Sequence, residues 1–339
     1  MRSKLRTVTL GCIVPTFSIL VLVCALLSSS PAQSQSAAKS STTAPAAQLS
    51  FDSAQQAADT VIKAAADFDV PMLLKIFGPD GEDFFTSPDN VQDKNYALAF
   101  AAKAQEKTVV AVDPKNASRA TLVVGDLDWP FPVPIVKKGN KWFFDSAAGK
   151  NEILYRRIGA NELDAIQVCR GFVEAQLEYA SEVHDQSAVN QYAQKVFSTP
   201  GKHDGLYWKN EDGTAGGPIS EGVARAIEEG YEARERTGYH GYYFKILKGQ
   251  GPAAPLGKLD YVIEGVMIGG FALVAVPSEY RVTGVKTFMV SYSGIVYEKD
   301  LGPDSLSIVK NMERYNPDKT WHPTDDQWPP DEVAAISAP

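Results

Sequence analysis

Apolar residues recur at helical spacing after residue 50, and farther along they alternate with polar residues as in strands. Ala57, Val61, Ala64 and Phe68 lie three or four residues apart, and Asp52 or Ser53 precedes them as a candidate helix cap. The pattern also predicts helices over Val70–Phe77 and Asp93–Lys107, followed by strands at Thr108–Val112, Ala120–Val124, Pro132–Val136 and Lys141–Phe144.

A second series of the same kind follows. A long helix is expected over Glu162–Val183, with one apolar stripe made of Leu163, Ile166, Cys169, Val173, Leu177 and Ala180. A shorter helix is expected over Glu221–Arg236. Strands are then expected at Tyr242–Leu247, Tyr261–Val266, Phe271–Val276, Lys286–Val290 and Ile295–Glu298.

This order predicts an α+β protein with two domains. N-terminal helices with a small antiparallel sheet come first, at 51–147, and a long helix packed on a second antiparallel sheet follows, at 148–323. Ala147–Asn151 is expected to link the two domains. A Ser-, Ala- and Thr-rich flexible linker at 35–50 and a disordered tail at 324–339 are expected to flank them.

The first 34 residues have the organisation of a secretory signal peptide. Three basic residues precede the uncharged apolar run Leu10–Leu27, and small polar residues follow it, including Ala32-Gln33-Ser34. We therefore expect a protein of the periplasm or the extracellular space, with no stable membrane span after cleavage. The alternative, left open, is a retained anchor, because eighteen apolar residues could just cross a bilayer.

Charge and cysteine content narrow the possible partners. The chain has a formal charge of −8, and loss of the leader with its three basic residues leaves 30 basic against 41 acidic residues. Such an acidic surface repels phosphate groups, so nucleic acid is not expected as a partner. Cys12 and Cys24 leave with the leader. The remaining Cys169 lies at an apolar helical position and is expected to be a buried hydrophobic residue.

The segment Trp129–Pro134 carries the first candidate binding residues. Prolines at alternate positions remove alternate backbone donors, which predicts an edge strand or an extended segment. Trp129 and Phe131 either form an exposed docking edge, or line a cleft together with Trp142, or fold inward as core. The last is the commoner outcome for aromatic residues.

A second set of candidate residues, Tyr207, Trp208 and His240, falls in the C-terminal half. Tyr207 and Trp208 lie in a long polar loop, and His240 precedes a strand, where it is a weak candidate for a general base. The sequence contains no HExxH, GxSxG or CxxC motif, and the four histidines lack the spacing of helical ligands. Neither a metal nor a cofactor is expected.

Two further motifs fail on physical grounds. Gly249–Ala254 matches a dinucleotide-binding pattern, but Pro252 and Pro255 forbid the helix that would hold the phosphates. The acidic groups Asp80, Glu82 and Asp83 lack a calcium-loop pattern and are expected to be a solvated turn.

Several sequence blocks carry a resemblance to a known family. The segments DWPFPVP at 128–134, GLYW at 205–208, YHGYYF at 239–244, MIGGFALVAV at 267–276 and VYEKDLG at 296–302 resemble an uncharacterised exported bacterial family, domain of unknown function 2950. The resemblance covers about Phe51–Pro323. It implies export and no particular activity.

Residues Ala165–Gly302 also resemble the head domains of type IV pilin-like and pseudopilin proteins. The similarity lies in the order of a helix containing Glu174–Ala180, the block Gly241–Phe244, an apolar strand ending at Pro277, and the blocks Thr283–Phe288 and Ser293–Val296. Pilins place their helix directly after the leader, whereas a whole domain intervenes here. The resemblance therefore implies a shared head fold and not a filament subunit.

The sequence favours an exported cell-envelope protein with a non-catalytic binding or assembly role, and envelope proteins are its expected partners. The alternative is a periplasmic enzyme or small-molecule-binding protein with its site near His240 or at the cleft of Trp129 and Phe131. The oligomeric state is not determined by the sequence.

Overall fold

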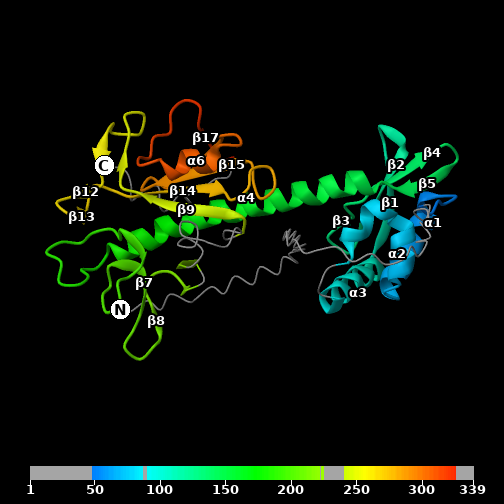
Figure 1. Ribbon diagram of the computed structural model, residues 1–339, viewed down its shortest axis with the longest axis horizontal. Helices are drawn as coiled ribbons and strands as arrows, with labels where there is room; N and C mark the ends of the chain where they lie inside the picture. The colour runs from blue at the N-terminus through cyan, green and yellow to red at the C-terminus, as the bar shows by residue number, and fades with distance from the viewer. Residues whose placement is uncertain (1–47, 87–89, 222, 225–239, 326–339) are drawn as a thin grey trace, which may run out of the picture. The chain divides into compact units, whose positions relative to one another are not determined.

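The computed structural model describes residues 48–86, 90–221, 223–224 and 240–325, and these residues form two compact units (Figure 1). Unit 1 ends at Ile153 and unit 2 begins at Leu154. Helices combined with mostly antiparallel sheets confirm the predicted α+β class. The leader at 1–34, most of the linker at 35–50, most of the helix expected over Glu221–Arg236 and nearly all of the tail lie outside the described residues.

The helices that precede the sheet of unit 1 are α1 (Ala54–Ala66), α2 (Val70–Phe77), the 3₁₀ helix η1 (Pro79–Phe84) and α3 (Asn90–Glu106). The first two begin at side-chain caps. The hydroxyl of Ser53 accepts a hydrogen bond from the N–H of Gln56, as the capping pattern predicted. The carboxylate of Asp69 accepts one from Met72 in the same way at α2.

The sheet of unit 1 is antiparallel. Its strands are β1 (Thr108–Asp113), β2 (Asn116–Val124), β3 (Trp129–Pro130), β4 (Ile135–Lys138) and β5 (Lys141–Phe144). They follow the order β1-β2-β4-β5, and β3 pairs with β2 beyond this path. The strand predicted at Pro132–Val136 instead begins at Ile135, because Pro132 and Pro134 have no N–H to donate to a ladder.

The core of unit 1 lies between the helices and the sheet. Ala57, Ala58 and Ile76 are fully buried there, opposite Leu122 and Ile135 of the sheet. The end of the expected linker also belongs to this unit. The side chain of Gln48 donates to the carbonyls of Ile76 and Phe144, so unit 1 includes residues before its predicted start at Phe51.

The longest element, α4 (Ser146–Tyr179), begins sixteen residues earlier than predicted. Residues 147–151, which were expected to link the domains, belong to this helix, where the Asp145 carboxylate accepts the N–H of Ala148 and Gly149 is tolerated. The predicted apolar stripe is wrong at two positions, since Leu163 and Leu177 are exposed. The stripe that packs in unit 2 is Ala165, Ile166, Cys169, Phe172, Val173, Gln176 and Tyr179.

The main sheet of unit 2 is an antiparallel array in the order β17-β16-β15-β14-β9. Its strands are β9 (Tyr242–Leu247), β14 (Ala272–Pro277), β15 (Lys286–Ser291), β16 (Tyr297–Asp300) and β17 (His322–Pro323). All six residues of β14 are buried, and they share one core with the buried stripe of α4. The short helix α6 (Ser305–Lys310) contacts β14 where an irregular segment was expected.

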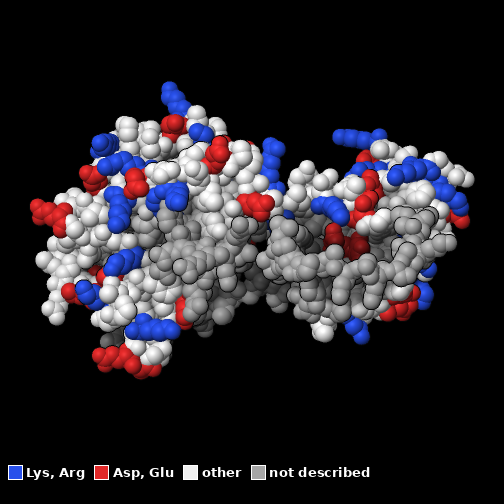
Figure 2. Space-filling view, viewed as in Figure 1, with Lys and Arg blue, Asp and Glu red and all other residues white. Residues whose placement is uncertain are grey.

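Smaller sheets complete unit 2. They are formed by β6 (Lys195–Phe197), β7 (Gly205–Lys209) and β8 (Ala215–Gly216), by β10 (Gly249–Gln250) with β11 (Leu259–Asp260), and by β12 (Val262–Ile263) with β13 (Val266–Met267). The single strand predicted at Tyr261–Val266 is a hairpin, because the chain turns at Glu264 and Gly265, both of which have positive φ. None of the described helices combines the length and the apolar character of a membrane span. On the face that Figure 2 shows, basic and acidic side chains are interspersed.

Candidate functional site

Trp129 and Phe131, the candidates in unit 1, are half-buried and pack against the core. Their rings meet edge to face at 6.3 Å between centroids, and the ring of Phe131 lies 5.1 Å from that of Phe100. The third member of the proposed cleft, Trp142, bonds through its backbone to Phe51. These contacts account for the aromatic residues as packing groups, and a ligand-binding role for them stays a prediction.

Tyr207 and Trp208 are neighbours on β7 and therefore point to opposite sides of the strand. Tyr207 is buried, and its hydroxyl donates to Oε2 of Glu221 at 3.2 Å. The ring of Trp208 stacks on that of His203 at 4.5 Å and lies 5.8 Å from that of His184. The structure thus pairs Trp208 with two histidines that the sequence analysis did not single out.

Four aromatic rings, those of Tyr179, His184, His203 and Trp208, form a cluster. His184 stacks on Tyr179 with 4.0 Å between centroids, and the hydroxyl of Tyr179 donates to the carbonyl of His203 at 2.6 Å. Burial, followed by the nearby carboxylates, raises the pKa of Tyr179 to about 12, so the phenol stays neutral and keeps its proton for this bond.

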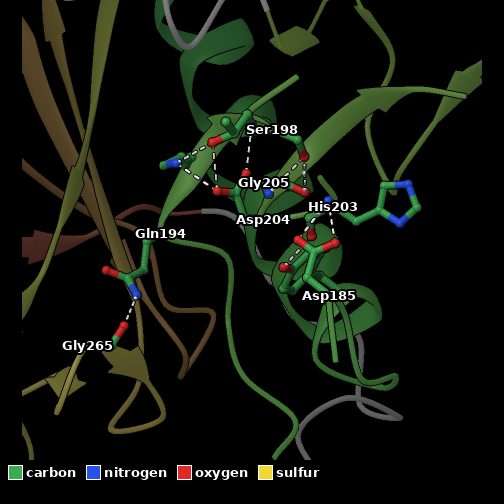
Figure 3. Close-up of polar contacts among 10 residues, drawn as sticks. Asp185, Gln194, Ser198, His203, Asp204, Gly205 and Gly265 are labelled. Carbon is green, nitrogen blue, oxygen red and sulfur yellow. Dashed lines mark hydrogen bonds and ion pairs between the residues drawn. The ribbon is translucent and has the colours of Figure 1, made fainter. Parts of the chain in front are cut away.

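Carboxylates fix the loop that carries His203 (Figure 3). Both oxygens of Asp185 accept the backbone N–H of His203, at 3.0 and 2.8 Å. Asp204 accepts from the N–H and hydroxyl of Thr199 and from Lys195 Nζ. Burial alone raises the pKa of Asp204, but these donors outweigh it and lower the pKa to about 2. Figure 3 shows the ring of His203 turned away from Asp185, whose carboxylate accepts the backbone N–H of His203.

His240 lies elsewhere in unit 2, against α4. Its Nδ1 contacts Oδ2 of Asp164, and its backbone has a φ of +46° just before β9 begins. Both side chains remain more than two-fifths exposed, at 42% and 43%. The sequence analysis named His240 but not its acidic partner, because 76 residues separate the two.

His240 and Asp164 line one end of a groove of about 400 Å³ along α4. One wall comes from α4, and the other comes from Pro218, Ile219, Ser220, Val223 and His240. The lining side chains are Asp164, Gln167, Val168, Gly171, Glu174, Ala175, Glu178, Pro218, Ile219, Ser220, Val223 and His240. Among these described residues, three carry carboxylates and none is Lys or Arg, so the electrostatic potential that they produce in the groove favours cations.

The helix itself aligns the acidic groups. Asp164, Gly171, Glu174 and Glu178 recur at three, four or seven residues, which places them along one face of α4. From Asp164 to Glu178 the helix rises about 21 Å at 1.5 Å per residue. Gly171 leaves open space in the middle, since a Cβ there would meet nothing within 4 Å. This acidic row is the signal in the sequence that was missed, because it resembles an ordinary solvated helix face.

The sequence analysis considered a metal site and a dinucleotide-binding segment. Among the described residues, no group of three or more His, Cys, Asp or Glu side chains is placed to hold a metal ion. In the segment that matched the dinucleotide-binding pattern, the side chain of the buried Gln250 donates to the carbonyls of Pro255 and Gly257, and Asn316 accepts the N–H of Ala253. The loop is thus held by its own chain.

A family model described as a protein of unknown function, DUF2950, matches residues 48–324. Neither the curated proteins nor the solved structures contain a match to the chain.

Proposed function

This chain belongs to the DUF2950 family of proteins of unknown function, and we propose that it is an exported envelope protein that binds a positively charged ligand in the groove along α4. The observation that carries the proposal is the lining of the groove, where the described residues include three carboxylates and neither Lys nor Arg. Export is proposed from the leader at 1–34, and binding is proposed from the groove.

The groove combines charge with apolar surface. Val168, Ala175, Ile219 and Val223 line it together with the carboxylates. A ligand with amino or guanidinium groups on apolar stems, such as a Lys- or Arg-containing peptide, fits both properties. The length of about 21 Å between Asp164 and Glu178 suits an extended ligand.

The acidic row has a cost that a cationic ligand would relieve. Glu174 and Glu178 are four residues apart on one helix, and like charges at this spacing destabilise a helix by about 0.2–0.5 kcal/mol. A cation between the two carboxylates replaces this repulsion with attraction. The described lining residues supply no such cation.

Binding is tested by calorimetric titration with a short Lys- and Arg-rich peptide and with its Glu-substituted counterpart. We expect binding of the basic peptide only, with an affinity that falls as salt is added. The double variant Glu174→Gln/Glu178→Gln should weaken it by about tenfold. A matched control, Glu211→Gln/Glu264→Gln, removes two exposed carboxylates outside the groove and should leave it unchanged. Equal binding by both double variants would refute the site.

Export is tested separately by sequencing the N-terminus of protein from the envelope and the cytosol of the producing cell. A new N-terminus near residue 35 in the envelope fraction is expected. Intact protein confined to the cytosol would contradict export without affecting the result of the titration. The pilin-like resemblance of the C-terminal half stays a prediction.

A second candidate function is hydrolysis, favoured by the contact between His240 Nδ1 and Asp164 Oδ2. An acidic group at Nδ1 orients an imidazole so that Nε2 can act as a base, and Ser220 lines the same groove. The side chains of His240 and Asp164 are both exposed, so water competes with the contact between them. This exposure favours the binding function over hydrolysis. Ester and peptide hydrolysis that disappears in His240→Ala would support the enzyme. Hydrolytic activity that is unchanged in His240→Ala and in Tyr207→Phe would refute this second function.

A further inference from the structure

Strand β1 forms an edge of the unit 1 sheet. It is the first strand in the order β1-β2-β4-β5, and among the described residues no strand pairs with its outer side. The strand runs from Thr108 to Asp113 and pairs with β2 over its whole length. Its outer backbone groups therefore decide what this edge can bind.

The ladder register shows which backbone groups face outward. The N–H of Gly125 donates to the carbonyl of Lys107 at 2.9 Å, which makes these two a hydrogen-bonded pair of the antiparallel ladder. Such pairs alternate, so Val109 and Ala111 bond to β2, whereas Thr108, Val110 and Val112 turn their N–H and C=O groups outward.

The other side of β2 agrees with this assignment. Leu122 faces Val110 in the register, and its carbonyl accepts the N–H of Phe131 at 2.7 Å. A residue of β2 that bonds to β3 points its backbone N–H and C=O away from β1, as in a non-hydrogen-bonded pair. The backbone N–H and C=O of Val110, its partner on β1, therefore point away from β2.

The side chains of this edge do not protect it. Edge strands in natural proteins are commonly blocked by charges, prolines or bulges. The run Thr108–Val112 has neither charge nor proline, and the bulge falls only after Val112. Val109 is 43% and Val112 53% exposed. The edge is thus apolar and has outward-facing donors and acceptors.

We propose that two copies of this protein join their unit 1 sheets through β1, antiparallel and centred on Val110. In this register Val110 faces Val110 of the second copy, and Thr108 faces Val112 at both ends. All three are the residues whose backbone groups point outward. The pairing extends the sheet across a two-fold axis, as in β-strand addition.

Charge complementarity selects this register and this occupant. With Val110 at the centre, Lys107 of each copy faces Asp113 of the other, so opposite charges meet at both ends. A centre at Ala111 would place Lys107 opposite Lys115, and a centre at Val109 would place Asp113 opposite Gln105. A second copy is therefore the partner that the sequence of the edge itself matches.

The first test removes one outward donor. Val112→Pro deletes an N–H that does not bond to β2, so the unit 1 fold should persist, which circular dichroism and the melting temperature can verify. Sedimentation of the purified protein over a range of concentrations should show a dimer for the natural sequence. The two donors lost per dimer should raise its Kd by about tenfold or more.

Charge exchange provides a second test that does not depend on proline. Lys107→Glu should weaken the dimer, and the double variant Lys107→Glu/Asp113→Lys should restore it. Lys107 also pairs with Asp128 within its own chain at 2.6 Å, so Asp128→Asn is the control and should leave the dimer intact. A natural protein that is monomeric at every concentration, or a dimer that none of these changes weakens, would overturn the proposal.

Discussion

The side-chain amide of Gln176 forms two hydrogen bonds with the backbone of Ala193. Nε2 donates to the carbonyl of Ala193 and Oε1 accepts its N–H, each at 2.8 Å. Gln176 is fully buried, so water cannot replace either bond. The side chain thereby acts as a strand residue would, and it ties the last turns of α4 to the segment before β6.

Gln176→Ala should therefore lower the free energy of unfolding by about 2–4 kcal/mol, because it leaves both backbone groups of Ala193 buried without partners. Urea unfolding measures this loss. Gln194→Ala is the matched control. It removes one exposed bond, to the carbonyl of Gly265, and should cost about 1 kcal/mol or less. Similar losses for both variants would contradict the assigned role of Gln176.

Glu162 fixes α4 to the turn before β15 by a different contact. Its Oε1 accepts the N–H groups of Val285 and Lys286 at 2.9 and 3.0 Å. Glu162→Ala should destabilise the protein by about 1–3 kcal/mol. Glu162→Gln keeps an oxygen at this place and should cost less than half as much. Thermal unfolding of the two variants provides the comparison. An equal loss of stability in both would show that an acceptor oxygen at this position does not account for the contribution of Glu162.

Asp204 should make stability depend on acid. Its pKa in the folded protein is about 2, below the ordinary value of 3.8 that applies on unfolding. The unfolded chain therefore binds the proton first as pH falls, so the stabilisation is complete above about pH 4 and is lost toward pH 2. This stabilisation amounts to about 2 kcal/mol. In Asp204→Asn, the free energy of unfolding should depend less on pH between about pH 4 and pH 2. A pH dependence equal to that of the natural protein would contradict the assigned role of Asp204.

Cys169 should be chemically inert in the folded protein. It is fully buried, and this burial raises its pKa to about 12, so almost no thiolate is present at neutral pH. A thiol reagent should react with the native protein only as fast as it unfolds and should react rapidly in denaturant. Rapid labelling of native protein, measured by mass spectrometry, would show that the helix opens locally.

Gly217 should tolerate no side chain. Its φ is +92°, and a Cβ there would lie 2.3 Å from the carbonyl oxygen of Leu206. Gly217→Ala should cost about 2 kcal/mol or more. Gly213 has a similar φ of +80° with nothing within 4 Å of a Cβ, so Gly213→Ala isolates the backbone strain at about 1 kcal/mol. Equal effects on the midpoint of unfolding would remove the steric argument.

The elements with the clearest periodicity were predictable from sequence. Lys141–Phe144 and Tyr242–Leu247 match the structure at both ends, and the cap at Ser53 forms as the pattern indicates. The start of α4 was missed because residues 147–160 carry charges and two glycines with weak periodicity. Their helical state is stabilised by packing and by the Asp145 cap, which propensity does not register.

The candidate site was only partly predictable. His240 stood out because histidine is uncommon, but its neighbour Asp164 lies 76 residues earlier on α4. The sequence analysis grouped Trp208 with His240, whereas the ring of Trp208 contacts the rings of His184 and His203. Which side chains meet depends on loop paths, and local patterns do not encode these.

The sequence by itself determined the α+β class, the two groups of helices and strands and the family, because these depend on local periodicity and on ordered blocks of residues. The tertiary structure decided which face of α4 is buried and which carboxylates line a groove. It also decided which edge of the first sheet has outward-facing backbone groups. These depend on contacts between residues far apart in the chain, where burial of apolar surface outweighs the preferences of any single segment.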